Sequence, residues 1–120
     1  MKKCYYLSTC DTCRRIIKDL QLREHDFKFQ DIKNRPISVS ELEQWRKSVS
    51  SYSDLFNRRA RKYRSEGLKD KELSEDQIKE WILKEYTFLK RPVIVFGNHL
   101  FIGNSKKVIE EAKGVLYETK

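Results

Sequence analysis

The sequence is poor in the residues that interrupt, cross-link or anchor a chain: its 120 residues include four glycines, two prolines and three cysteines. No apolar run approaches the roughly 20 residues of a membrane-spanning helix, so we expect no membrane association. Internal repeats, low-complexity segments and linkers are also missing, and a chain of this length forms a hydrophobic core without disulfides. We therefore predict a single globular domain over residues 1–120.

The chain is polar and basic, and its positive charge makes nucleic-acid binding an alternative to be weighed against the motifs present. The N-terminus has two lysines but no long apolar stretch, so we expect no secretory signal and a cytoplasmic location. The formal net charge is +8, and five of the 26 basic residues lie between Asn57 and Arg64. A charged run of this kind is usually a solvated helix face. Because no DNA- or RNA-binding motif accompanies it, we expect no direct contact with nucleic acid.

Hydrophobic periodicity predicts a strand, a helix and a second strand at the N-terminus. Lys3–Leu7 and the segment around Phe27 and Phe29 have the composition of strands. Between them, apolar residues recur at the three- and four-residue spacing of an amphipathic helix that begins at Asp11. This interpretation puts Cys10 at the N-terminus of the helix.

Local signals predict the helices and strands in the rest of the chain. These signals are two capping boxes, a glycine that ends a helix, and a β-prone run followed by Gly-Asn. The strand–helix–strand unit, a helical insertion, a β-hairpin and a C-terminal helix together predict an α/β chain with a mixed sheet and a thioredoxin-like fold. The predicted segments are capped helices after Ser38 and Ser74, one helix over Tyr52–Glu66 that stops at Gly67, strands over Arg91–Phe96 and His99–Ile102, and a last helix after Ser105.

Cys10 and Cys13 form one C-x-x-C motif at the predicted junction of the first strand and the first helix. The peptide N–H groups of a helix start favour thiolate over thiol, as do nearby arginines such as Arg14 and Arg15. A Cys10 thiolate attacks an oxidised substrate, and attack by Cys13 on Cys10 then closes a disulfide within the motif. In a reducing compartment this spacing therefore indicates redox chemistry.

Other interpretations of the cysteines stay open at this stage. Cys13 also fits a small apolar residue on the buried face of the helix, and Cys4, inside the first predicted strand, is expected to be core. A zinc site requires four ligands. Because there is no second C-x-x-C and His25 and His99 are isolated, we expect no bound metal.

Arg91 and Pro92 open the predicted hairpin. In a thioredoxin-like fold a proline at the start of this strand is usually cis, and the peptide before it faces the start of the C-x-x-C helix. We therefore expect Arg91 to lie near Cys10. The alternative is that Pro92 marks a strand edge and Arg91 is an ordinary surface residue.

Taken together, these residues resemble the ArsC/Spx family over nearly the whole chain. The family holds glutaredoxin-linked arsenate reductases, and Spx-type regulators that bind the α subunit of RNA polymerase and sense oxidants through C-x-x-C. The resemblance rests on Cys10-Asp-Thr-Cys13-Arg14-Arg15, on Asn57-Arg-Arg59 with Tyr63 and Gly67-Leu68 beyond it, and on Lys90-Arg91-Pro92-Val93 before the hairpin.

The resemblance to the reductases implies a thiol-dependent reductase in which Cys10 attacks arsenate and Cys13 resolves the adduct. No bound metal or organic cofactor is implied, and the implied reductant is glutathione with glutaredoxin, or thioredoxin. The predicted site residues are Cys10 and Cys13 for catalysis, Arg14, Asn57, Arg59 and Arg91 for binding the oxyanion, and Pro92 as a structural residue in the cis form.

The resemblance to the regulators implies a second function, a redox-switched protein that binds the RNA polymerase α subunit without turnover. Cys13 is a feature of the regulators, and Asn57 and Gly103 stand where the reductases have arginines. Each lost arginine removes a charge-assisted contact to an oxyanion. A third interpretation is an interaction module whose C-x-x-C is redox-inert.

Overall fold

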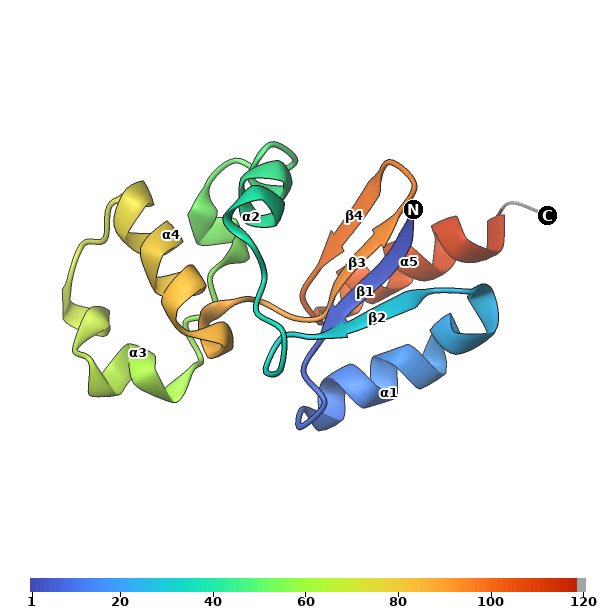
Figure 1. Ribbon diagram of the computed structural model, residues 1–120, viewed down its shortest axis with the longest axis horizontal. Coiled ribbons are helices and arrows are strands. Elements are labelled where there is room, and N and C mark those ends of the chain that lie inside the picture. The colour runs from blue at the N-terminus through green and yellow to red at the C-terminus, as the bar shows by residue number, and fades with distance from the viewer. Residues whose placement is uncertain (119–120) are drawn as a thin grey trace. The chain divides into compact units, whose positions relative to one another are not determined.

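The computed structural model describes residues 1–118 and contains two compact units. The first unit joins Met1–Arg35 to the chain from Arg91 onward, and the second consists of Pro36–Lys90. Strands and two long helices make up the first unit, whereas short helices and turns make up the second (Figure 1). The second unit is the predicted helical insertion.

A four-stranded mixed sheet forms the first unit, in the order β2-β1-β3-β4. β1 pairs in parallel with β2, and the antiparallel pairs β1/β3 and β3/β4 complete the sheet. The predicted mixed sheet and α/β class are confirmed. The parallel pair requires a crossover helix, and the hairpin requires only the Gly97-Asn98 turn, in which Gly97 has a φ of +60°. The strands are β1 (Lys2–Tyr6), β2 (Lys28–Asp31), β3 (Val93–Phe96) and β4 (His99–Ile102).

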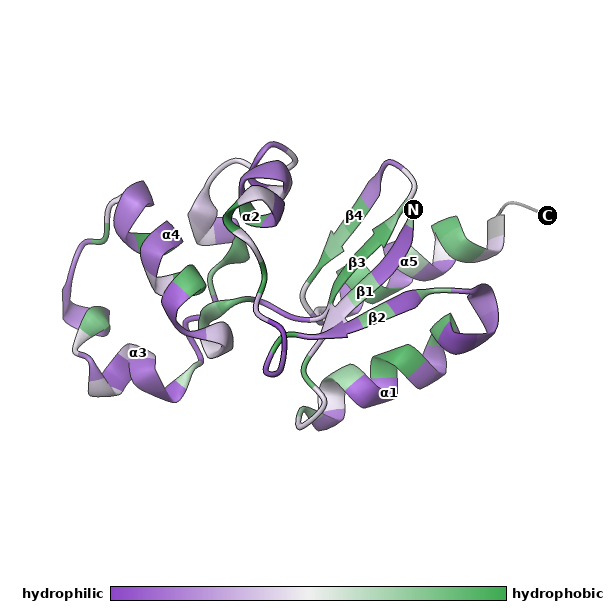
Figure 2. Cartoon of the chain, viewed as in Figure 1, coloured by the Kyte–Doolittle hydropathy of each residue, from purple (hydrophilic) through white to green (hydrophobic). Residues whose placement is uncertain are grey.

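Two helices, α1 (Asp11–Asp19) and α5 (Lys106–Glu118), pack on one face of this sheet. Strand residues alternate between the two faces of a sheet, so every second side chain of each strand meets these helices. The Tyr117 hydroxyl of α5 donates a hydrogen bond of 2.9 Å to the carbonyl of Leu20 at the end of α1. Hydrophobic residues lie along β3 and β4 and on one side of α1, whereas β2 is largely hydrophilic (Figure 2). The buried core of this layer is Cys4, Ile16, Ile17, Leu20, Leu22, Phe27, Ile94, Phe101, Ala112 and Leu116.

The second unit contains the helices α2 (Val39–Arg46), α3 (Arg61–Ser65) and α4 (Glu75–Lys84). Both predicted capping boxes are present, with the hydroxyls of Ser38 and Ser74 each accepting a backbone hydrogen bond at the first turn of the helix. The aromatic centre of this unit includes the rings of Phe56 and Phe88, which stack with centroids 5.1 Å apart. Three short 3-10 turns complete the unit, at Tyr52–Leu55, Leu68–Asp70 and Tyr86–Phe88.

The prediction of one helix over Tyr52–Glu66 is wrong. The chain makes a 3-10 turn over Tyr52–Leu55, is extended at Phe56, and becomes helical again only in α3. Phe56 forms an isolated antiparallel bridge with Leu89. Two hydrogen bonds hold this bridge: the Asn57 N–H donates to the Phe88 carbonyl at 2.6 Å, and the Lys90 N–H donates to the Leu55 carbonyl at 2.9 Å. Backbone pairing with a segment 33 residues away therefore overrides the local helical pattern.

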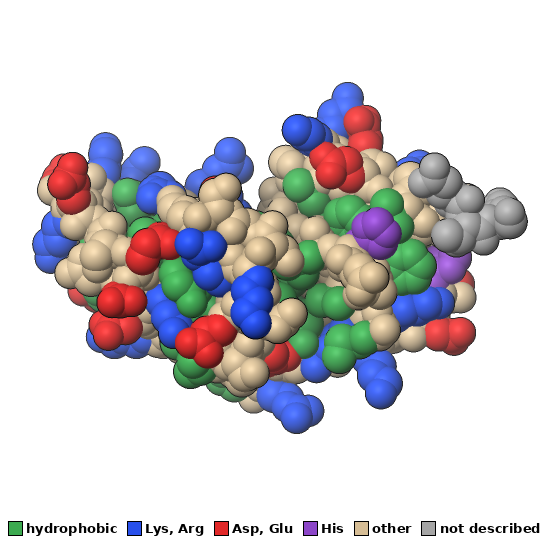
Figure 3. Space-filling view, turned by 90° about the horizontal axis from the view of Figure 1, so that it is seen from above, with side chains coloured by type: hydrophobic (Ala, Val, Ile, Leu, Met, Phe, Trp, Pro, Cys, Tyr) green, Lys and Arg blue, Asp and Glu red, His purple; other side chains and the backbone are tan. Residues whose placement is uncertain are grey.

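The basic run in this unit is largely solvated. Lys62 pairs with Glu85 at 2.8 Å, the Arg58 guanidinium lies 5.3 Å from the centre of the Phe56 ring, and Arg59 is exposed. Basic and acidic side chains are interspersed over the visible surface of the molecule (Figure 3). Within residues 1–118, no helix is long and apolar enough to cross a membrane.

Candidate active site

Cys10 is the N-cap residue of α1, in the loop that leaves β1. Its backbone is extended, with φ −95° and ψ 113°. The Cys10 N–H donates to the Leu7 carbonyl at 3.0 Å, and its carbonyl accepts from the Arg14 N–H at 3.2 Å. These bonds fix the half-buried Cys10 side chain at the N-terminus of the helix, where unpaired peptide N–H groups favour negative charge.

Hydrogen bonds and charge make Cys10 the more acidic thiol of the motif. Burial raises the pKa of Cys10, but hydrogen bonds from the Cys13 backbone and side chain, the charge of Arg91 and the Thr12 N–H together outweigh burial. The net effect is a pKa below the ordinary value of a cysteine. Cys10 therefore has the larger thiolate fraction near neutral pH, and a thiolate is the nucleophilic form of cysteine.

Cys13 is fully buried in the first turn of α1. Burial raises the pKa of Cys13 to about 12, and a backbone hydrogen bond from Leu7 offsets only part of that increase. Cys13 is consequently a thiol at neutral pH and a hydrogen-bond donor to Cys10. The third cysteine, Cys4, is also fully buried, and burial raises its pKa. All three cysteines are free.

Arg91 reaches this site from the other end of the sequence. Its charge acts on both Cys10 and Cys13. The Arg91–Pro92 peptide bond is cis. The loop before α5 holds this segment, because the Asn104 side chain donates to the Arg91 carbonyl at 3.3 Å and the Gly103 N–H donates to the Pro92 carbonyl at 2.9 Å.

Arg14 is directed to other partners. Its guanidinium donates to the Ser8 carbonyl at 2.5 Å and forms an ion pair with the Asp11 carboxylate, one turn earlier on the helix. The main influences on the Cys10 pKa include the charge of Arg91 but not the charges of Arg14 and Arg15. Sequence reasoning missed Asp11, although its three-residue spacing from Arg14 is the spacing of a helical ion pair.

Asn57 and Arg59 belong to the second unit. The Asn57 side chain donates to the Thr87 carbonyl at 3.1 Å, and its oxygen accepts from the Arg59 N–H at 3.1 Å. Asn57 therefore stabilises the turn that presents the exposed Arg59 side chain. Sequence reasoning also missed Asn104, whose role depends on a contact with Arg91, 13 residues away.

No group of three or more His, Cys, Asp and Glu side chains within the described residues 1–118 has the arrangement of a metal site. The described parts of the candidate site in the first unit are the thiolate-forming Cys10, the protonated Cys13 and the Arg91 guanidinium.

The chain was compared with protein-family profiles and with known proteins, and both comparisons give matches over most of its length. The profile of the ArsC family matches residues 5–112. The uncharacterized protein YusI of Bacillus subtilis strain 168 is 30% identical over 110 residues, which cover 89% of this chain and 93% of YusI.

Two solved structures have the same fold. A possible arsenate reductase from Streptococcus mutans UA159 is 29% identical, with a TM-score of 0.75 over 93% of this chain and 97% of that one. An arsenate reductase from Vibrio cholerae is 17% identical, with a TM-score of 0.77 over 92% and 95% of the two chains. The predicted thioredoxin-like fold is confirmed, since these neighbours are structures of that type.

Proposed function

The chain belongs to the ArsC family, and from that premise we propose that it is a thiol-dependent reductase of an arsenate-like oxyanion. The observation that supports this most is the asymmetry of the two thiols. Cys10 has a lowered pKa at a helix N-terminus, and Cys13 beside it stays protonated and donates to the Cys10 sulfur. Cys10 is thus available as the nucleophile, and Cys13 is available to resolve the adduct in a later step.

In the first step the Cys10 thiolate attacks the arsenic atom of arsenate. A sulfur–arsenic bond forms as one As–O bond breaks: a hydroxyl group of the protonated arsenate takes up a proton from solvent and leaves as water. The peptide N–H groups at the start of α1 and the Arg91 guanidinium stabilise the negative charge of the adduct. Arg14, Asn57 and Arg59 are proposed as the further oxyanion-binding residues.

In the second step Cys13 loses its proton and attacks the Cys10 sulfur. A disulfide forms and the sulfur–arsenic bond breaks, so its electron pair stays on arsenic, which leaves as arsenite. Arsenic gains two electrons and the two thiols lose them. Glutathione with glutaredoxin, or thioredoxin, then returns two electrons and two protons to the disulfide. No bound metal or organic cofactor takes part in this scheme, and the reaction is proposed to occur in the cytoplasm.

The test is arsenate-dependent NADPH oxidation in two coupled systems, one with glutathione and glutaredoxin and one with thioredoxin and its reductase. We expect turnover in the wild type and none with Cys10→Ser. Cys4→Ser is the matched control, because Cys4 is buried away from solvent with a raised pKa and is expected to leave turnover intact. Full activity in Cys10→Ser, or no wild-type turnover in either system, contradicts the proposal.

A second candidate function is a redox-switched regulator that binds the RNA polymerase α subunit. The observation that favours it is that two predicted oxyanion ligands are engaged elsewhere: Arg14 pairs with Asp11, and the Asn57 amide is bonded to Thr87 and Arg59. Capture of purified α subunit by the oxidised or the reduced chain only, abolished in Cys10→Ser, supports this function. Equal capture in both redox states, or none, counts against it.

A further inference from the structure

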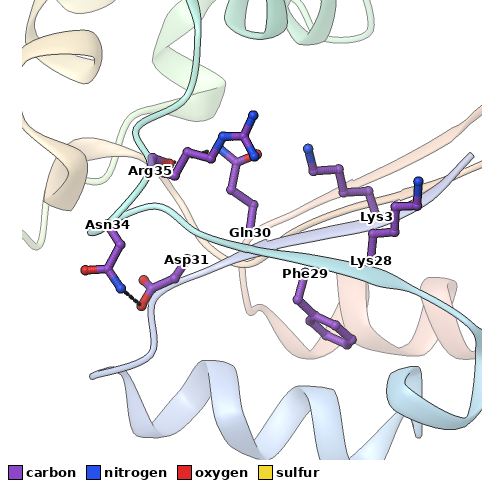
Figure 4. A pocket seen from close by; sticks show the side chains of 7 residues that line it. All are labelled: Lys3, Lys28, Phe29, Gln30, Asp31, Asn34 and Arg35. Carbon is purple, nitrogen blue, oxygen red and sulfur yellow. Dashed lines mark hydrogen bonds between the residues drawn. The ribbon is translucent and has the colours of Figure 1, made fainter.

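Strand register puts a row of basic side chains on the face of the sheet opposite α1 and α5. Cys4 and Phe29 are register partners and pack toward those helices. The residues one position earlier, Lys3 and Lys28, are also partners, so by alternation both side chains lie on the other face. Figure 4 shows Lys3 and Lys28 on the same side of the strands and Phe29 on the opposite side. Like charges placed side by side on neighbouring strands repel each other.

A third cation joins this pair from the loop after β2. Arg35 lines the same pocket, which has a volume of about 260 Å³. The buried Gln30 side chain donates a hydrogen bond of 2.9 Å to the Arg35 carbonyl, and this bond holds the loop against the strand. In Figure 4 the Arg35 guanidinium extends over Gln30, on the side of the two lysines.

The one carboxylate that lines the pocket does not compensate these charges. Asp31 is on the opposite face of β2 from Gln30, and it accepts hydrogen bonds from the Ser8 and Lys33 N–H groups and from the Asn34 side chain, at 3.2–3.3 Å. Within residues 1–118, neither Lys28 nor Arg35 forms an ion pair. The pocket therefore carries more positive charge than its own residues neutralise.

We propose that this pocket, built by Lys3, Lys28, Gln30 and Arg35, binds a small molecule that carries two or more adjacent phosphate groups. Lysine supplies a point charge and arginine a planar fork, and both are common phosphate ligands. Because the three cations come from two strands and the following loop, a ligand with several anionic groups matches them better than one with a single group. The Gln30 amide lies between Arg35 and the two lysines and adds a polar group to the lining of the pocket (Figure 4).

This binding site is separate from the proposed thiol chemistry. None of its lining residues is a cysteine or Arg91. Because phosphate has the shape and charge of arsenate, the probes can also bind at the proposed oxyanion site, and binding has to be followed residue by residue. Shifts at Lys3, Lys28, Gln30 and Arg35 report the pocket, shifts at Cys10 and Arg91 report the oxyanion site, and neither depends on arsenate turnover.

The experiment is a titration followed by backbone amide NMR shifts at about 0.15 M salt, where long-range surface attraction is largely screened. The probes are orthophosphate, pyrophosphate, tripolyphosphate and citrate, the last being a polyanion without phosphate. We expect saturable shifts centred on the four pocket residues, with tripolyphosphate and pyrophosphate binding at least tenfold more tightly than orthophosphate and citrate. Binding also raises the unfolding temperature, because the stabilisation grows with the logarithm of one plus the ratio of the free ligand concentration to Kd.

The variant is Lys28→Gln with Arg35→Gln, and the matched control is Lys18→Gln with Lys113→Gln. Both pairs remove two positive charges from exposed positions of the first unit, but Lys18 and Lys113 lie on the helices of the other face. We expect the Kd for tripolyphosphate to rise at least tenfold in the pocket variant and less than twofold in the control. Equal losses in both variants, no saturable binding, or citrate binding as tightly as tripolyphosphate overturns the proposal.

Discussion

Cys13, in the first turn of the helix that Cys10 caps, lowers the pKa of Cys10 through both its backbone N–H and its side-chain thiol. Cys13 can serve as donor because burial keeps it protonated, with a pKa of about 12. The proposed resolving thiol is therefore also a group that makes the nucleophile acidic. Removing the Cys13 sulfur therefore affects both the activation of Cys10 and the formation of the internal disulfide, and different substitutions at Cys13 distinguish the two effects.

Cys13→Ala removes the side-chain donor, whereas Cys13→Ser keeps a donor and removes the sulfur. We expect the pKa of Cys10 to rise in Cys13→Ala and to rise less in Cys13→Ser. The measurement is the rate of iodoacetamide alkylation against pH, with mass spectrometry to assign the label to Cys10. Both variants are expected to lose coupling to thioredoxin, since neither can form the internal disulfide. Identical pH profiles for the two variants contradict the role of the Cys13 donor.

Arg91→Gln removes the cation that lowers the pKa of Cys10. We expect the alkylation profile to move to higher pH, and kcat/KM for arsenate to fall roughly ten- to a hundredfold, the usual cost of losing a hydrogen bond to a charged group. Arg91→Lys is expected to recover most of the alkylation shift but less of the arsenate activity, because lysine has charge without the planar fork. Lys18→Gln, near the C-terminal end of the helix that Cys10 caps, is the control. A profile unchanged in Arg91→Gln refutes the electrostatic role.

Asp11→Asn releases Arg14 from its ion pair. The pair is exposed, with 55% of the Arg14 side chain and 91% of the Asp11 side chain accessible, so its contribution is small. We expect the KM for arsenate to fall roughly two- to fivefold, which corresponds to an exposed ion pair of up to about 1 kcal/mol. Asp19→Asn, at the other end of α1, should leave KM unchanged. No difference between the two variants means that Arg14 does not act on the oxyanion.

Ser38→Ala tests the capping box of α2. The Ser38 hydroxyl accepts from the Glu41 N–H at 3.0 Å, and the Ser38 N–H donates to the Glu41 carboxylate at 2.9 Å. We expect the free energy of unfolding, measured by urea titration, to fall by about 1 kcal/mol. Ser40→Ala, two residues into the same helix and exposed, is expected to change it by less than about 0.5 kcal/mol. A similar loss in both variants rules out a specific capping effect.

The ion pair between Lys62 and Glu85 predicts a pH dependence of stability. The hydrogen bond from Lys62 lowers the pKa of Glu85 below its ordinary value of 4.5. The folded-state pKa is below the unfolded-state pKa, so the stabilisation is complete above pH 4.5 and is lost as the pH falls through the folded-state value. Glu85→Gln should therefore lose less stability than the wild type between neutral pH and about pH 3. Glu80→Gln, an exposed control in α4, should follow the wild type.

Sequence patterns predicted those parts of the molecule that depend on neighbouring residues. The capping boxes at Ser38 and Ser74, the stop at Gly67 and the position of Cys10 at the start of α1 all depend on contacts within one or two helical turns. The prediction of one helix over Tyr52–Glu66 was wrong because the backbone around Leu89, far away in the sequence, forms the hydrogen bonds of the segment around Phe56.

Two features of the chain follow only from its tertiary structure. Arg91 was expected near Cys10 from the analogy of the fold, but its electrostatic effect on both thiols depends on β3 pairing beside β1. The row formed by Lys3, Lys28 and Arg35 depends on the parallel register of β1 with β2, which no local pattern encodes. The sequence by itself determined the element order, the thiol motif and the helix ends, because these depend on short-range periodicity and hydrogen bonding. Tertiary structure decided which distant charges meet, because strand register and loop packing bring together residues far apart in the chain.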